Sequence, residues 1–136
     1  MQRLDIDTMP AADKALLEAA MAAREKSYSP YSHFAVGAAV RSADSGKLYQ
    51  GTNIENASYG LTVCAERNGI FAAVGAGERH FDAICVVADL AEPVSPCGAC
   101  RQVMAEFKIK RILLANLQGD IAEYTLEELL PYGFEL

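Results

Sequence analysis

The hydrophobic pattern of the first part of the chain predicts a helix followed by a β-hairpin. Residues 10–26, PAADKALLEAAMAAREK, carry their larger apolar side chains at helical spacing, which favours an amphipathic helix. Apolar residues at even spacing in FAVGAAV, which begins at Phe34, predict a buried strand. The turn-forming SADSG joins this strand to KLYQGTNIEN, so we expect residues 34–54 to form an antiparallel pair.

The rest of the chain alternates between helical and strand patterns. Residues 63–76 favour a helix, and the continuous apolar run at 82–88 predicts a strand covered on both faces, so helices must lie on both sides of the sheet. A further helix after PCGAC, two strands joined by the turn at 118–120, and a short final helix complete the pattern. We therefore expect an α/β fold with three α/β/α layers and a mixed five-stranded sheet whose last two strands are antiparallel. No repeat or linker divides residues 1–136, so a single domain is expected.

Composition and charge narrow the class of partner. The 136 residues, of which 51% are hydrophobic, suffice for one domain with a real core. A net charge of −6 does not attract a phosphate backbone, so a small molecule is a better partner than a nucleic acid polymer. No apolar stretch approaches the roughly 20 residues that span a bilayer, and the N-terminal segment lacks the apolar core of a secretion signal. We expect a cytoplasmic protein without a membrane partner, whose four cysteines are thiols or metal ligands.

Three of these cysteines fall where helices are expected to begin. Cys64 is at the start of the 63–76 helix, and Cys97 and Cys100 are three residues apart at the start of the next one. The Cys-x-x-Cys spacing alone suits a redox dithiol, half of a structural zinc site, or part of a catalytic zinc centre. Helix starts favour the thiolate that zinc binds, and three protein ligands leave a fourth position for water, as in catalytic sites. Cys85 lies within an apolar run and is expected to be a core residue.

The two charged residues that follow Cys64-Ala65 can serve such a centre. A carboxylate at Glu66 beside a metal-bound water can take its proton and pass it on. Alone, a glutamate at this position would only complement the positive end of the helix, but the three cysteines favour the catalytic interpretation. Arg67 can donate to the ligand sulfurs and offset their negative charge, although a solvated surface arginine explains it equally well.

Asn53 and Glu55 alternate on one face at the end of the second strand. A buried glutamate without a nearby cation is costly unless hydrogen-bond donors surround it, and a vicinal diol can provide such donors. The alternative is an exposed pair at a strand end.

Cys64-Ala65-Glu66 together with Pro96-Cys97-Gly98-Ala99-Cys100 resembles the signature of the zinc-dependent cytidine deaminase superfamily. YSPYSHFAVGAAV, GTNIENASYG and VSPCGACRQV are similar to its small homotetrameric branch, which acts on free nucleosides, and the resemblance covers roughly residues 12 to 134. It implies one Zn²⁺ per subunit on the three cysteines, with Glu66 as the catalytic proton carrier and Arg67 neutralising the thiolates. It further implies that Asn53 and Glu55 hydrogen-bond the ribose hydroxyls, that Phe34 packs against the nucleoside, and that the Ala65 N–H binds the base carbonyl. Tyr59 and Phe134 would reach this site from a neighbouring subunit, and Phe134 would stack on the pyrimidine.

The resulting hypothesis is hydrolytic deamination of cytidine, and of 2′-deoxycytidine, to the uridine counterpart and ammonia in pyrimidine salvage, with no redox cofactor. The alternative within the class is a deaminase of a cytosine-containing antibiotic nucleoside of the blasticidin type, against which the Asn-Ile-Glu pair argues. The net charge disfavours a nucleic-acid base editor. A thioredoxin-like protein would leave Cys-Ala-Glu unexplained, and a non-catalytic zinc module normally has four protein ligands.

Overall fold

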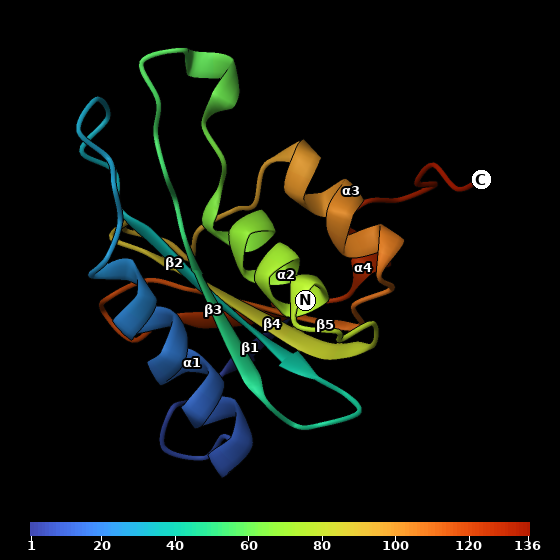
Figure 1. The fold of residues 1–136 in the computed structure, drawn as a ribbon. Coiled ribbons are helices and arrows are strands. Elements are labelled where there is room, and N and C mark those ends of the chain that lie inside the picture. Colours follow the sequence, from blue (N-terminus) through green and yellow to red (C-terminus); the bar gives the residue numbers. More distant parts are fainter.

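Six strands of the computed structural model, which describes residues 1–136, form one mixed sheet with helices on both faces (Figure 1). The elements in chain order are β1 (Gln2–Leu4), α1 (Ala11–Arg24), β2 (Val36–Ser42), β3 (Leu48–Thr52), a 3₁₀ turn (Tyr59–Leu61), α2 (Ala65–Gly75), β4 (Phe81–Ala88), α3 (Gly98–Glu106), β5 (Arg111–Ala115), β6 (Ile121–Tyr124) and α4 (Leu126–Leu129). The strand order is β1-β6-β5-β4-β2-β3, and only β4 and β5 pair in parallel. None of the helices has the length and apolarity needed to cross a membrane.

The predicted fold class is confirmed, although the sheet has six strands where five were expected. The pair β2–β3 and the final pair β5–β6 are antiparallel, as predicted. The additional strand is β1, which pairs with β6 at the edge of the sheet. Three residues with no buried side chain among them cannot show the alternating pattern by which strands are detected.

The alternation of side chains along the strands produces two cores. Ile84, Val86 and Leu114 face the side covered by α2, α3 and α4, whereas Cys85 and Val87 face α1. Because each central strand is buried on both faces, β4 reads as an uninterrupted apolar run. Cys85 is fully buried and its burial raises the pKa of its thiol to about 12, so it behaves as a core residue.

Two glycines let helices lie directly against the sheet. A Cβ on Gly37 of β2 would be 2.0 Å from the backbone oxygen of Ala20 in α1. A Cβ on Gly51 of β3 would be 2.2 Å from the backbone oxygen of Ala65 and equally close to the backbone nitrogen of Gly69, both in α2. The start of α2 therefore rests on the backbone of β3.

Candidate active site

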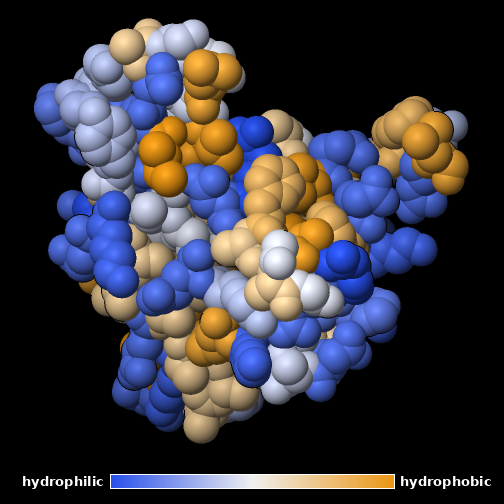
Figure 2. Space-filling model, in the orientation of Figure 1, coloured by the Kyte–Doolittle hydropathy of each residue, from blue (hydrophilic) through white to orange (hydrophobic).

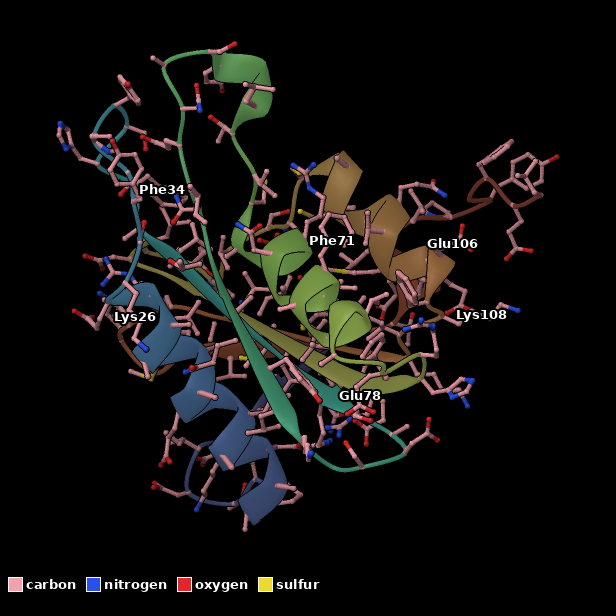
Figure 3. The ribbon with its side chains drawn as sticks, viewed as in Figure 1. Lys26, Phe34, Phe71, Glu78, Glu106 and Lys108 are labelled. Atoms are coloured by element: carbon pink, nitrogen blue, oxygen red, sulfur yellow. The ribbon has the colours of Figure 1, made fainter.

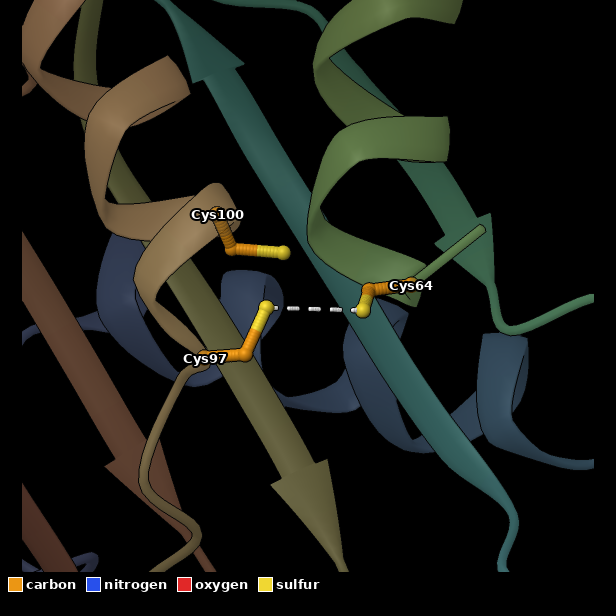
Figure 4. Close-up of side chains that lie close together, drawn as sticks. All are labelled: Cys64, Cys97 and Cys100. Carbon is orange, nitrogen blue, oxygen red and sulfur yellow. Dashed lines mark hydrogen bonds between the residues drawn. The ribbon is translucent and has the colours of Figure 1, made fainter. Parts of the chain in front are cut away.

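Two helix starts bring three cysteine sulfurs together (Figure 4). Cys64 is the N-cap of α2, Cys97 is the N-cap of α3, and Cys100 lies in the first turn of α3. The three Sγ atoms all lie within 4.8 Å of one another, and those of Cys64 and Cys97 are 3.7 Å apart. A tetrahedral zinc with bonds of about 2.3 Å spaces its sulfur ligands about 3.8 Å apart, so the cluster has the donor type and the spacing that this metal requires.

Polar contacts favour the charged form of Cys64. The neighbouring Cys100 thiol and the Arg67 guanidinium lower the pKa of the Cys64 thiol to about 5, which favours its thiolate form. Arg67 donates from Nη2 to the Cys64 sulfur over 3.4 Å. The positive charge of Arg67 thus faces the sulfur of Cys64.

Glu66 lies beside this cluster in the first turn of α2 and is only 4% exposed. Burial raises the pKa of its carboxyl, and the negative charge of Cys64 acts in the same direction. Cys64, as the N-cap, has an extended backbone and is not part of the regular helix, so the two side chains need not follow helical geometry. A carboxyl that takes up a proton more readily than usual, held next to a cluster of sulfurs, is suited to proton transfer.

Arg101 fixes the loop that carries Cys97, a role that the sequence does not predict. Its Nε donates to the Pro96 carbonyl over 2.8 Å, and its other nitrogens donate to Ser95 Oγ at 2.8 Å and to the Leu129 carbonyl at 2.7 Å. The only signal in the sequence is an arginine directly after Cys100. Its hydrogen-bond partners, Ser95, Pro96 and Leu129, cannot be predicted from its position in the sequence. A planar guanidinium with several donors is well suited to holding such a loop.

The side chain of Asn53, which directly follows β3, is buried, and its oxygen accepts two hydrogen bonds. Its Oδ1 accepts hydrogen bonds from the Val36 N–H over 3.0 Å and from the Ser27 hydroxyl, and its Nδ2 donates to the Phe34 carbonyl over 2.7 Å. One N–H of the amide stays available to a ligand.

Glu55 is bound by the loop between α1 and β2. One of its oxygens accepts the backbone N–H groups of Tyr31, at 2.9 Å, and of Ser32, at 3.1 Å, while the other accepts the Ser32 hydroxyl. The Ser32 hydroxyl is the main cause that holds the pKa of Glu55 below its usual range. The chain itself therefore supplies donors to this glutamate, and these donors lie 23 and 24 residues away in sequence.

The structure places the other predicted contact residues in three different settings. Ala65 is fully buried as the first residue of α2, next to Cys64. Phe34 ends the loop before β2 and is partly exposed (Figure 3). Tyr59 and Phe134 are 89% and 68% exposed, on segments that project from the sheet (Figure 1), and the C-terminal segment ends in apolar side chains at the surface (Figure 2).

The arrangement distinguishes between the interpretations of the Cys-x-x-Cys segment. A redox dithiol would leave the third sulfur and the buried carboxyl beside it without a role, and a closed structural zinc site normally has four protein ligands. Three sulfurs at two helix starts, with one thiol favoured as thiolate and a buried carboxyl beside them, define the centre of a zinc enzyme.

Comparison with known proteins identifies the family. The model of the cytidine and deoxycytidylate deaminase zinc-binding region matches residues 10–116. A cytidine deaminase of Halalkalibacterium halodurans is 56% identical over 88% of this chain and 91% of its own length, and one of Sporosarcina psychrophila is 55% identical over 82% and 83%. The crystal structure of cytidine deaminase from Burkholderia pseudomallei, 50% identical, superposes with a TM-score of 0.86 over 93% of this chain and 100% of that one. The chain belongs to the cytidine and deoxycytidylate deaminase family, and it is a zinc-dependent deaminase.

Proposed function

We propose that the protein deaminates the free nucleosides cytidine and 2′-deoxycytidine to uridine and 2′-deoxyuridine, with release of ammonia, in pyrimidine salvage. The observation that carries this proposal is the buried Glu66 carboxyl beside the cluster of Cys64, Cys97 and Cys100. The names of the similar proteins, all cytidine deaminases, support the choice of substrate.

Glu66 would carry the protons of the reaction. Cys64, Cys97 and Cys100 would hold a zinc ion, which would supply Lewis-acid chemistry that makes water a nucleophile near neutral pH. Glu66 would take one proton from the attacking water and deliver it to ring N3 as the oxygen bonds to C4. It would then take the remaining proton from the new C4 hydroxyl and deliver it to the amino group as the C4–N bond breaks, which leaves a carbonyl at C4. Water and the nucleoside are thereby converted to the 4-oxo product and ammonia. The backbone N–H of Ala65, in the first turn of α2, would bind the carbonyl of the base.

Asn53 and Glu55 would bind the sugar, and their free hydrogen-bonding capacity supports this role. After the contacts described above, Asn53 keeps one N–H donor and Glu55 keeps about one acceptor position of the four on a carboxylate. One hydroxyl can accept from the first and donate to the second. A site that binds only one sugar hydroxyl accepts both ribose and deoxyribose when the two sugars share that hydroxyl. Phe34 would pack against the nucleoside next to this contact.

The test of this proposal is turnover by the purified, zinc-loaded protein, followed by the absorbance change of the pyrimidine. We expect cytidine and 2′-deoxycytidine to be deaminated with kcat/KM values within about tenfold of each other, since at most one hydroxyl contact distinguishes them. A cytosine-containing nucleoside of the blasticidin type is the control substrate. Preference for that substrate over cytidine would contradict the proposal and establish the alternative.

We also propose that the chain is a single catalytic domain over residues 1–136, that it is cytoplasmic, and that it forms a homotetramer with shared active sites. The one continuous sheet and the four free cysteines support the first two statements. The third is supported by Tyr59 and Phe134, which bear large apolar surfaces on projecting segments and would reach the site of a neighbouring subunit.

Mixing two variants that are impaired in different residues tests whether sites are shared. Phe134→Ala is expected to lose about tenfold or more of kcat/KM because a stacking contact with the base is lost. When this variant is co-expressed with Glu66→Gln, about a quarter of the sites combine an intact Glu66 with an intact Phe134 from a neighbour, so about a quarter of wild-type activity should return. Hybrids are isolated with a different tag on each variant and assayed on cytidine. An activity equal to the mean of the two separate variants would contradict the sharing of sites.

A further inference from the structure

The hydroxyl of Ser32 joins two residues of the proposed nucleoside site. It donates to Oε2 of Glu55 and accepts the backbone N–H of Phe34 over 3.0 Å. The backbone N–H of the same serine donates to the other oxygen of Glu55. Ser32 thus binds both carboxylate oxygens of Glu55 and, at the same time, the residue that would pack against the nucleoside.

The peptide groups of Phe34 are held from both sides. Its N–H is bound by Ser32, and its carbonyl accepts Nδ2 of Asn53 over 2.7 Å. The backbone of Phe34 therefore connects the two side chains that would contact the sugar. In Figure 3, Phe34 lies at the end of the loop before β2, beside the connection from β3 to α2 on which Asn53 and Glu55 lie.

The conformation of the loop supports a specific role for this connection. His33 has a left-handed backbone with φ of 57°, which a non-glycine residue adopts only at a cost, and its N–H is bound to the Ser29 carbonyl at 3.0 Å. This turn presents the backbone N–H groups of Tyr31 and Ser32 together to one oxygen of Glu55. The backbone strain is thus located where it makes a binding site for the carboxylate.

We propose that Ser32 is a positioning residue for sugar recognition: its hydroxyl fixes the carboxylate of Glu55 so that the one remaining acceptor position meets a sugar hydroxyl. This inference rests on the proposed function and deepens it. Without the Ser32 hydroxyl, Oε2 of Glu55 loses its donor and the Phe34 N–H loses its acceptor, so the carboxylate is held only through Oε1. The sugar does not react, so its contacts stabilise the bound substrate and the transition state alike. Loss of such a contact is therefore expected to raise KM and to leave kcat nearly unchanged.

The test compares Ser32→Ala with wild type on cytidine, 2′-deoxycytidine and 3′-deoxycytidine. For cytidine we expect KM to rise about tenfold with kcat within about twofold of wild type, the size of one lost hydrogen bond to a charged group. One of the two deoxynucleosides lacks the hydroxyl that Glu55 binds. For that substrate, the KM of Ser32→Ala should be about equal to the KM of wild type, because Glu55 makes no contact with it that the substitution could weaken. Ser32→Thr, which keeps a hydroxyl, should restore most of the affinity. Ser29→Ala removes a hydroxyl from the same loop without touching Glu55 and serves as the matched control.

The results separate this inference from the function on which it rests. An equal rise in KM for all three nucleosides, or a rise in Ser29→Ala as large as in Ser32→Ala, would show a general loss of loop structure and overturn the role assigned to Ser32. An unchanged KM in Ser32→Ala would overturn it as well, while active wild-type protein leaves the proposed function in place. Wild-type protein that fails to deaminate cytidine would overturn the proposed function, and this inference with it.

Discussion

Replacing Glu66 by glutamine is expected to lower kcat for cytidine by about 10³-fold or more, with zinc still bound and the fold retained. Glutamine has nearly the same shape as glutamate but can neither take the proton of the water nor deliver one to N3 or to the departing amine. Because the same side chain would act in several proton transfers, its loss falls on kcat, and substrate binding should change much less. Burial raises the pKa of the Glu66 carboxyl by disfavouring its charge, so a neutral amide of nearly the same shape is tolerated at this position.

Three measurements make the Glu66→Gln result specific. Metal analysis should find one zinc per chain in wild type and variant, thermal unfolding should find no loss of stability, and a nucleoside analogue should bind to both. Glu127→Gln, a substitution at an exposed position of α4, is the matched control and should leave turnover unchanged. Turnover by zinc-loaded Glu66→Gln at the wild-type rate would assign proton transfer to another group.

Gly51→Ala is expected to destabilise the protein by about 3 kcal/mol or more, the upper part of the range for overpacked sites. Most contacts that a new Cβ makes in a core are relieved when a side chain changes rotamer. Here every near contact is backbone of α2, the oxygen of Ala65 and the nitrogen and Cα of Gly69, at 2.2 to 2.7 Å. The helix itself must move, and because Cys64 caps this helix, its sulfur must move relative to those of Cys97 and Cys100.

Chemical denaturation and zinc titration test this expectation together. Gly51→Ala should have a lower denaturation midpoint and a weaker affinity for zinc than wild type. Gly75→Ala is the matched control because a Cβ on Gly75 meets nothing within 4 Å, and alanine is the better helix former by about 1 kcal/mol. If the two variants were equally stable and bound zinc equally well, the close approach of α2 to β3 would not be what positions Cys64.

An element could be predicted from the sequence when its pattern of hydrophobic and polar residues was long. The run at 82–88 is apolar on both faces and predicts a strand covered on both sides, which is β4, and the long amphipathic pattern at 10–26 predicts α1. The strand β1 could not be found, since three residues paired at an edge carry no periodic signal. The strand predicted over residues 47–56 ends at Thr52. Beyond it, the backbone of Asn53 and Glu55 bonds to Tyr28 in the loop before β2, and Ile54 forms isolated bridges with Tyr28 and Val63.

The site was predictable where its residues share a short segment. Cys64 and Glu66, and likewise Cys97 and Cys100, are close in sequence and stand at helix starts, so their chemistry could be read from spacing. Ser32 gave no such signal, because its relation to Glu55 depends on a turn made by His33 and on a contact across 23 residues. The same holds for Arg101, whose partner Leu129 is 28 residues away. Contacts of this kind become visible only when the chain is folded.

The hydrogen bonds of Asn53 and Glu55 have a consequence for affinity. Both side chains are fixed in place by the protein before any ligand arrives. Most of the conformational entropy that their ordering costs is therefore spent during folding, and a sugar that binds to them meets a preorganised surface. A nucleoside can then be held through few direct contacts, which suits an enzyme that must release a product differing from its substrate at a single position of the base.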